Sequence, residues 1–273
     1  MALWICTACG LEHEDSAAPP ERCEVCTDER QFVPLTGQAW ITAKQLESQG
    51  TLLHTAPIET GLHRLSVAPR VGIGQQALLV QTSTGNLLWE PPGFISDAAA
   101  QTVRALGGVA AISGSHPHLM GAMVSWSQAF GGAPIYIAAA DRAWTRRPDS
   151  AIVHWSGEAN PLPGIRLVQC GGHFAGSSVL HWADGADGRG VIFTGDTIFI
   201  GPSGRTVSAM RSYPNLLPLP EGAVGQILDR LEPLVYDRAY GSFGQVIPSD
   251  AREVVRRSLA RYIEWLRGEV DDY

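Results

Sequence analysis

The chain has 273 residues, of which 45% are hydrophobic and 17% are charged, and its formal net charge is −7. This composition allows a sizeable buried core and excludes an intrinsically disordered chain. The negative charge argues against nucleic acid as a partner, and no apolar run approaches the roughly 18 residues that span a bilayer, so no membrane partner is expected.

The N-terminal residues Met-Ala-Leu-Trp-Ile-Cys lack the basic region and the long apolar region of a signal peptide. We therefore expect a cytoplasmic protein. In that reducing compartment, cysteines that occur in pairs are better interpreted as metal ligands than as disulfides.

Residues 1–35 contain two Cys-x-x-Cys pairs, Cys6 with Cys9 and Cys23 with Cys26. Each pair can donate two thiolates to one ion, which predicts a tetrathiolate knuckle of the zinc-ribbon kind. So short a segment cannot form a core of its own, and a structural metal would supply its folding energy. The knuckle also resembles that of rubredoxin, so iron and electron transfer stay open beside zinc. Redox-active or idle thiols are a further alternative.

The same N-terminal segment is acidic, with two arginines against seven aspartates and glutamates. A phosphate backbone would be repelled by this charge, so the knuckle is not expected to bind nucleic acid. We predict that residues 1–35 form the metal knuckle and that residues 36–273 form the main domain.

From about residue 60, short apolar runs alternate with helical patterns. Residues 77–80 and 86–89 predict a hairpin. Residues 96–106 predict a helix that begins at Ser96 and is ended by Gly107.

The second half of the chain continues this alternation. We expect a helix over 119–130, a strand over 134–140 and a hairpin over 179–193. Two helices close the chain, one with an apolar face over 224–231 and one beginning near residues 249–250. Strands interleaved with helices predict an α/β layered domain.

Three histidines and an aspartate each follow a short apolar run that is typical of a buried strand. They are His116 and His118 after residues 109–112, His173 after 165–170, and Asp196 after 191–194. Side chains that leave the ends of neighbouring strands can converge on one point. Three neutral imidazoles and a carboxylate suit a zinc ion that keeps one position open for water. The alternative is that these histidines only make hydrogen bonds within loops.

At these positions the chain resembles the metallo-β-lactamase superfamily of αββα hydrolases, over about residues 60–250. The motifs that carry the resemblance are Gly72-Ile-Gly-Gln75, His116-Pro-His118, Gly-Gly-His173 and Thr-Gly-Asp196. The resemblance implies an αββα sandwich in which the three histidines bind the metal and Asp196 takes the place of the bridging aspartate. Glu90 falls about where the family has a structural acid.

Two departures from the family pattern concern the second metal position of dinuclear members. Where the family has Asp-His, this chain has Met120-Gly121, and where a further histidine is common it has Tyr240-Gly-Ser-Phe-Gly-Gln245. A mononuclear centre is therefore expected, with Asp196 as a possible fourth ligand that orients the attacking water. The resemblance implies that His116, His118, His173 and Asp196 are the catalytic residues.

Three functions are considered. The first is a zinc hydrolase that acts on an ester, thioester, amide or phosphoester of a small molecule, because a three-histidine site lowers the pKa of bound water to about 7. The second is an iron-dependent redox protein, and the third is a binding module on a catalytically decayed fold. No oligomeric state is predicted.

Further polar and aromatic residues lie in segments that could line the site. Tyrosine and asparagine could donate to a developing oxyanion, although ordinary loop packing is favoured. Tryptophans could form pocket walls, although core packing is favoured, and Cys170 is interpreted as a small buried hydrophobic residue. The polar candidates are Tyr213, Asn215, Tyr236, Asp237 and Tyr240, and the tryptophans are Trp126, Trp144 and Trp155.

Overall fold

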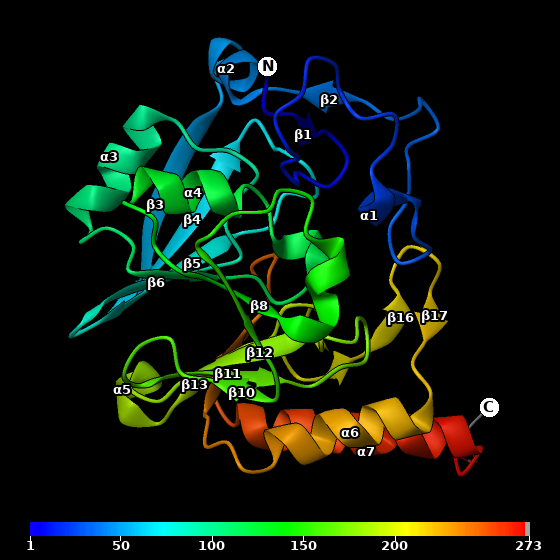
Figure 1. The fold of residues 1–273 in the computed structure, drawn as a ribbon. Helices are drawn as coiled ribbons and strands as arrows, with labels where there is room; N and C mark the ends of the chain where they lie inside the picture. Colours follow the sequence, from blue (N-terminus) through cyan, green and yellow to red (C-terminus); the bar gives the residue numbers. More distant parts are fainter. Residues whose placement is uncertain (271–273) are drawn as a thin grey trace.

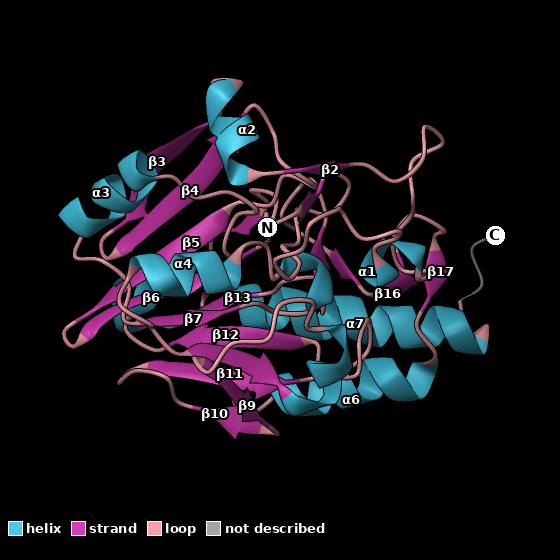
Figure 2. Ribbon diagram, turned by 45° about the horizontal axis from the view of Figure 1, so that its top comes forward, coloured by secondary structure: helices cyan, strands magenta, loops and turns pink. Residues whose placement is uncertain are grey.

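Two stacked β-sheets with helices on both outer faces form the centre of the protein (Figures 1 and 2). The computed structural model describes residues 1–270. Helices α3 (Asp97–Ala105) and α4 (Met123–Ala129) lie over one sheet (Figure 1). Helices α6 (Glu221–Leu231) and α7 (Ala251–Arg267) lie over the other. The expected αββα sandwich is confirmed, with a small cysteine-containing segment added at its N-terminus.

The first sheet has seven strands in the order β3-β4-β5-β6-β7-β8-β9. Pairing is antiparallel from β3 to β6 and parallel from β6 to β9. The predicted hairpin is confirmed as β5 and β6, whose residues 78–80 and 87–89 are buried. The strands are β3 Leu52–Glu59, β4 Leu62–Ala68, β5 Ala77–Thr82, β6 Gly85–Trp89, β7 Ala111–Ser113, β8 Ile135–Ala138 and β9 Ile152–Trp155.

The helices over the first sheet show one prediction that is confirmed and one that is partly wrong. Helix α3 (Asp97–Ala105) begins as predicted, because the Ser96 hydroxyl accepts a hydrogen bond from the backbone N–H of Ala99. Helix α4 (Met123–Ala129) begins four residues later than predicted. Residues 117–119 form a separate 3₁₀ turn, η1, and Gly121 has a φ of +50° that interrupts the helical path.

The second sheet has six strands in the order β10-β11-β12-β13-β18-β19. The predicted hairpin is confirmed as the antiparallel pair β12 and β13, and its loop contains the short α5 (Gly185–Gly188). The strands are β10 Glu158–Ala159, β11 Ile165–Gln169, β12 Ser178–Trp182, β13 Val191–Phe193, β18 Arg238–Tyr240 and β19 Val246–Ile247.

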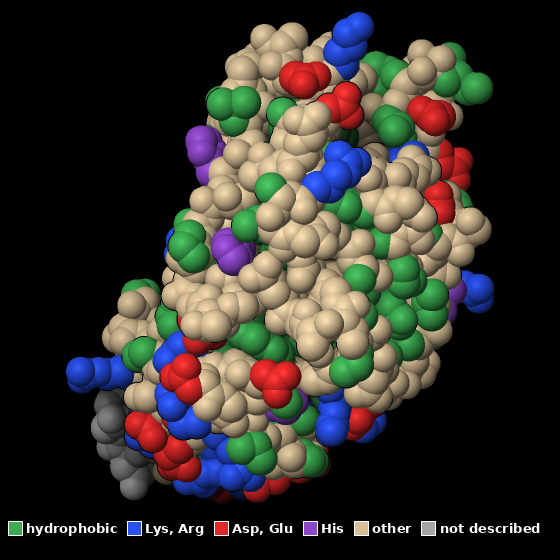
Figure 3. Space-filling view, turned by 90° about the vertical axis from the view of Figure 1, so that its left-hand side faces the viewer, with side chains coloured by type: hydrophobic (Ala, Val, Ile, Leu, Met, Phe, Trp, Pro, Cys, Tyr) green, Lys and Arg blue, Asp and Glu red, His purple; other side chains and the backbone are tan. Residues whose placement is uncertain are grey.

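Two long helices cover the outer face of the second sheet, as predicted. Helix α6 (Glu221–Leu231) and helix α7 (Ala251–Arg267) bury their apolar stripes against it through Val224, Ile227 and Val255. Their outer faces carry charged side chains, and ion pairs such as Arg252–Glu232 link neighbouring elements. Acidic and basic side chains gather accordingly on the lower part of the face in Figure 3.

Short elements connect β13 to α6 and lie beside the N-terminal segment (Figure 1). They form two small hairpins, and a 3₁₀ segment, η2 (Ala139–Trp144), follows β8. The hairpin strands are β14 Phe199–Ile200 with β15 Val207–Ser208, and β16 Met210–Ser212 with β17 Leu217–Pro218.

The N-terminal segment packs directly on the first sheet. Strand β1 (Ile5–Cys6) pairs with β2 (Trp40–Ile41), and α1 (Glu24–Thr27) and α2 (Ala43–Ser48) complete the segment. The four cysteines share one hydrophobic cluster with residues of the first sheet. A Cβ atom on Gly93 would lie 2.4 Å from the Gly10 carbonyl oxygen, so the two backbones are in close contact. The domain boundary at residue 35 stays a prediction.

Along residues 1–270, no helix is both long and apolar enough to cross a bilayer.

Candidate metal centre and active site

The four predicted ligands of the main domain come from loops that follow three strands. The loop after β7 carries His116 and His118, the loop after β11 carries His173, and the loop after β13 carries Asp196. Strand β7 belongs to the first sheet, whereas β11 and β13 belong to the second. The candidate ligands therefore converge from both sheets of the sandwich, and the expectation of neighbouring strands is wrong, because β12 also separates β11 from β13.

These four side chains form one buried cluster. Each can offer a ligand atom, and these atoms all lie within 4.8 Å of one another. His118 Nδ1 is 3.3 Å from His173 Nε2, and His116 Nε2 is 3.5 Å from Asp196 Oδ2. In a tetrahedral zinc site, ligands at about 2.1 Å from the ion are about 3.4 Å from each other. The spacing of the side chains therefore fits a single ion.

Hydrogen bonds to the other ring nitrogens orient two of the imidazoles. His173 Nδ1 lies 3.0 Å from the Arg211 carbonyl oxygen, so it carries the proton and leaves Nε2 as the free lone pair. Ser115 Oγ donates to Glu90 Oε1 at 2.5 Å and lies 2.9 Å from His116 Nδ1. Because the Ser115 proton goes to Glu90, its oxygen accepts the proton of His116 Nδ1. His116 Nε2, which has no hydrogen-bond partner, then faces the cluster as a lone pair.

Burial sets the charge state of the cluster. It lowers the pKa of His116 and His118 well below 6.5, and it lowers the pKa of His173 to about 4. The three imidazoles are therefore neutral at pH 7, as metal ligands must be. Burial also raises the pKa of Asp196 to about 7.

Glu90 is the buried acid behind the cluster. Its side chain is fully buried, its φ is +56°, and burial raises its pKa to about 8. Glu90 accepts a hydrogen bond from Ser115, and Ser115 in turn contacts His116. Glu90 is therefore connected to the cluster through Ser115 and is not one of its four members.

A cavity of about 190 Å³ opens beside His118 and Asp196. Its lining includes the aromatic side chains of Phe199, Tyr213 and Phe243. The small volume and the aromatic lining favour a small molecule with an apolar part.

The other polar candidates are spread over the molecule. Tyr213 lines the cavity, and its hydroxyl donates to the Asp196 carbonyl oxygen at 3.1 Å. Asn215 donates to the Glu29 carbonyl oxygen at 2.7 Å. Tyr236 and Tyr240 are buried in the hydrophobic clusters of the second sheet and of the sandwich interior, respectively, and Asp237 forms an ion pair with Arg189.

The tryptophans and the fifth cysteine mainly pack, as favoured from the sequence. Trp126 and Trp155 lie in hydrophobic clusters, and Cys170 is fully buried. Trp144 instead packs edge-on against the ring of Phe174, which follows His173.

Arg30 is a cavity residue that the sequence did not reveal. Its guanidinium lies 3.6 Å from the centre of the Phe174 ring, and Nη1 donates to the His173 carbonyl oxygen at 3.3 Å. It lines the cavity together with His118 and Asp196. The only signal in the sequence was its place four residues after Cys26.

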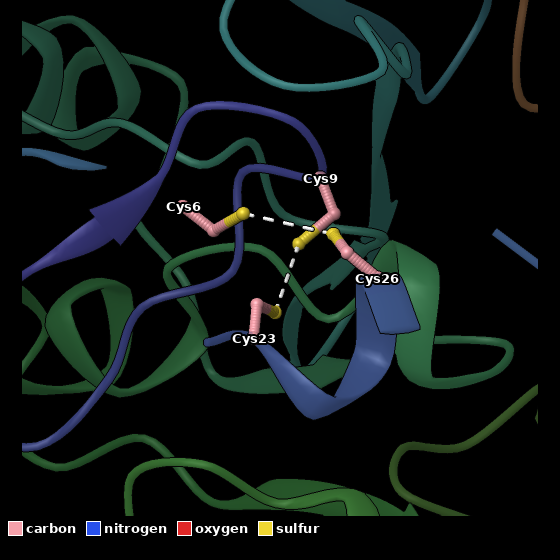
Figure 4. A group of neighbouring side chains, drawn as sticks. All are labelled: Cys6, Cys9, Cys23 and Cys26. Carbon is pink, nitrogen blue, oxygen red and sulfur yellow. Dashed lines mark hydrogen bonds between the residues drawn. The ribbon is translucent and has the colours of Figure 1, made fainter. Parts of the chain in front are cut away.

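The predicted cysteine cluster is formed as well, and its four sulfurs point toward one another (Figure 4). The Cys6–Cys26 and Cys9–Cys23 sulfur distances are 3.6 and 3.8 Å. A tetrahedral zinc ion with bonds of about 2.3 Å separates its sulfurs by about 3.8 Å, so the cluster fits such an ion. The hydrogen bond with Cys26 lowers the pKa of Cys23, which favours its thiolate form.

Met120 and Gly121 stand where dinuclear members of the family have ligands of a second metal, and both residues are tightly packed. Met120 is 2% exposed and belongs to the hydrophobic cluster of the first sheet. A Cβ atom on Gly121 would lie 2.0 Å from the Pro91 carbonyl oxygen, so this position cannot carry a ligating side chain without a backbone shift. The residues present therefore fit a mononuclear centre.

A family model described as the metallo-β-lactamase superfamily matches residues 73–243. The chain belongs to this superfamily. The matched region contains the cluster of His116, His118, His173 and Asp196, whereas the four clustered cysteines of the N-terminal segment lie outside it.

The chain is also similar to individual members. It is 40% identical over 272 residues to the uncharacterized protein YmaE of Bacillus subtilis (strain 168), with 99% of each chain covered. A structure described as the first B3 metallo-β-lactamase with an active-site glutamic acid superposes with a TM-score of 0.54 at 14% identity, covering 85% of this chain and 97% of that one. FIM-1 from Pseudomonas aeruginosa in its mono-zinc form gives a TM-score of 0.56 at 15% identity, covering 77% and 96%. These two structures support the fold alone.

Proposed function

We propose that the protein is a metal-dependent hydrolase with a mononuclear zinc centre, which cleaves an ester, thioester, amide or phosphoester bond in a small molecule. His116, His118 and His173 would hold the ion, and Asp196 would be the fourth ligand or would orient the attacking water. The observation that carries this proposal is the convergence of four ligand atoms within 4.8 Å, beside a cavity of about 190 Å³.

An ion at this site would supply a Lewis acid that activates water near neutral pH and polarises the carbonyl or phosphoryl oxygen of the substrate. The protein's own groups prepare the site for this chemistry. Ser115 and the Arg211 carbonyl oxygen hold His116 and His173 in the tautomers that present Nε2 to the cluster. Tyr213 anchors the backbone of Asp196, which keeps the carboxylate at the edge of the cavity.

The cysteine cluster has a structural part in this proposal. Cys6, Cys9, Cys23 and Cys26 would hold a second zinc ion that stabilises the knuckle of residues 1–35, and residues 36–273 would be the hydrolase domain. The buried cysteines, which form no disulfide, are consistent with action in the cytoplasm.

Metal analysis of the purified protein, together with hydrolysis of a panel of esters, thioesters, amides and phosphoesters, tests the proposal. We expect about two zinc ions per chain in the wild type and one in each of Cys6→Ser and His116→Ala. Hydrolysis should fall to background in His116→Ala and stay at the wild-type level in the control His154→Ala, whose histidine is exposed and outside the cluster.

The alternatives predict other results. Iron at either site, seen as visible absorption of an iron tetrathiolate or as iron in the metal analysis, would favour a redox function. Turnover that persists unchanged in His116→Ala would contradict a hydrolase centred on the histidines. Absence of turnover across the panel, with a metal present, would favour a binding module.

A further inference from the structure

One wall of the cavity beside His118 and Asp196 comes from the N-terminal knuckle. Arg30 and Gln31 line the cavity, and they follow Cys26 by only four and five residues. The tetrathiolate cluster and the candidate active site are therefore linked by one short segment of chain.

Several contacts hold Arg30 in place. Its Nε and Nη2 donate to the two carboxylate oxygens of Asp28 at 2.5 and 2.9 Å, and its Nη1 donates to the His173 carbonyl oxygen. The guanidinium also stacks on Phe174, and the side chain is 8% exposed. A guanidinium has five N–H donors, and these bonds use three of them. Two of its donors are not used by these bonds.

The same segment is also bound to the β16–β17 hairpin. The carbonyl oxygen of Glu29 accepts hydrogen bonds from Ser212 Oγ and Asn215 Nδ2 at 2.6 and 2.7 Å. Arg211, whose carbonyl oxygen orients His173, also pairs with the Glu29 carboxylate. Knuckle and hydrolase domain thus build this part of the cavity together.

The chemistry of the cavity restricts what it can bind. Its volume of about 190 Å³ has room for about six water molecules, so the bound part of a ligand is small. Apart from Arg30, its walls carry no Lys or Arg side chain among the described residues. The one guanidinium is already paired with the Asp28 carboxylate, so its remaining charge suits a singly charged carboxylate better than a doubly charged phosphate.

We propose that Arg30 is a specificity-determining residue that binds a carboxylate group of the substrate, while the apolar part of that substrate lies against Phe199, Tyr213 and Phe243. This inference rests on the proposed hydrolase function and names its substrate class. Small carboxylate-bearing esters, thioesters or amides are the class that the site selects.

Turnover of two matched esters tests this inference in the metal-loaded protein. The pair is 4-acetoxybenzoate and 4-acetoxybenzamide, which differ in charge and hardly in size. Arg30→Gln should lower kcat/KM for the benzoate by about 10- to 100-fold, mainly through KM, and change the value for the benzamide by less than about threefold. The kcat/KM of Arg30→Lys for the benzoate should lie between those of Arg30→Gln and the wild type. Lysine keeps the positive charge but lacks the planar guanidinium that binds a carboxylate through two N–H groups.

Arg146→Gln is the matched control. Arg146 also contacts the knuckle, through an ion pair with Glu24, but it does not line this cavity. This variant should behave as the wild type does toward both esters. An equal loss toward both esters in Arg30→Gln, or no loss toward either, would contradict the inference.

Equilibrium binding separates a failure of this inference from a failure of the proposed function. Calorimetry with phenylacetate and phenylacetamide measures recognition of the carboxylate without turnover. The wild type should bind phenylacetate more tightly than phenylacetamide, Arg30→Gln should lose that preference, and metal content should be the same in both proteins. If no member of the ester, thioester, amide and phosphoester panel is hydrolysed but this pattern holds, the hydrolase proposal fails and the recognition by Arg30 stands.

Asp28→Asn should strengthen phenylacetate binding, which is the opposite of the effect expected for Arg30→Gln. It removes the charge that neutralises Arg30 and keeps a side chain of the same size, so phenylacetate should bind several-fold more tightly. Unchanged or weaker binding in Asp28→Asn, or equal phenylacetate binding by Arg30→Gln and the wild type, would overturn the role of Arg30.

Discussion

Among single residues, Asp141 shows how burial of a carboxyl group affects stability. Its Oδ1 accepts a hydrogen bond from the Gly176 backbone N–H at 2.8 Å, whereas Oδ2 is buried without a partner. Burial raises the pKa of Asp141 to about 6 from an ordinary value of 3.8. The folded protein therefore holds this proton more tightly than the unfolded chain does, and its stability falls as the pH rises from about 4 to about 6.

Asp141→Asn should remove this pH dependence. The amide oxygen can still accept from Gly176, and no charge has to be buried at neutral pH. We expect the free energy of unfolding at pH 7 to rise by about 1–3 kcal/mol relative to the wild type, and the difference to disappear below pH 4. Urea unfolding of both proteins at pH 7 and below pH 4 measures this difference. A variant that is no more stable than the wild type at pH 7 would contradict the argument.

The four clustered residues could be predicted as candidate metal ligands from the sequence, whereas the place of Arg30 could not. Each of the four follows a recognisable apolar strand, so local patterns were enough to single out His116, His173 and Asp196. Arg30 contacts the carbonyl oxygen of His173, which is 143 residues away in the chain. No local pattern of residues encodes such a contact.

At the scale of elements, helix α4 depends on a residue of the knuckle. The carboxylate of Glu12 accepts hydrogen bonds from the backbone N–H groups of Val124 and Ser125 at 2.5 and 3.1 Å, in the first turn of α4. It also pairs with Arg147 at 2.7 Å and is 3% exposed. Ala122, at the N-cap position, has no side chain that can cap the helix, so the Glu12 carboxylate caps it instead.

Glu12→Ala should therefore destabilise the protein strongly. It removes the cap of α4 and leaves the largely buried Arg147 without its carboxylate, and we expect a loss of about 3 kcal/mol in the free energy of unfolding. Chemical denaturation measures this loss. Glu14→Ala, at an exposed position two residues along, is the control and should change stability by less than about 0.5 kcal/mol. Equal effects of the two substitutions would rule out the capping role.

The helices illustrate what local patterns can and cannot predict. The start of α3 was predictable because its cap, Ser96, is the neighbouring residue in the sequence. The start of α4 was not, because Gly121 is held in its left-handed conformation between Pro91 and Glu12, which are distant in the chain.

At the scale of the whole molecule, the knuckle and the sandwich should unfold together. Gly93 lies where the two backbones meet, and its φ is not in the left-handed region. A methyl group there would be 2.4 Å from the Gly10 carbonyl oxygen and 2.8 Å from its Cα. Gly93→Ala therefore tests the packing between the two parts and not backbone strain.

We expect Gly93→Ala to lower the free energy of unfolding by about 2 kcal/mol or more, and to weaken retention of the knuckle metal against a chelator. Gly222→Ala is the control, because Gly222 lies in α6 and a Cβ atom there would have nothing within 4 Å. It should be neutral, or stabilising by up to about 1 kcal/mol. Wild-type stability and metal retention in Gly93→Ala would show that the contact is unimportant.

The αββα architecture was predictable as a whole, because alternating strand and helix patterns and the ligand motifs pointed to one family. The position of the knuckle was not predictable. Its contacts are made between glycine backbones and through Glu12 and Arg30, and none of these leaves a periodic pattern in the sequence.

The wall that Arg30 and Gln31 contribute bears on inhibitor selectivity. These residues lie outside residues 73–243, the region shared with the family model, so this wall is not part of the common scaffold. An inhibitor directed only at the cluster of His116, His118, His173 and Asp196 would contact residues that lie inside the region shared with the family model. A compound that also fits the knuckle-derived wall would discriminate between this protein and family members without such a segment.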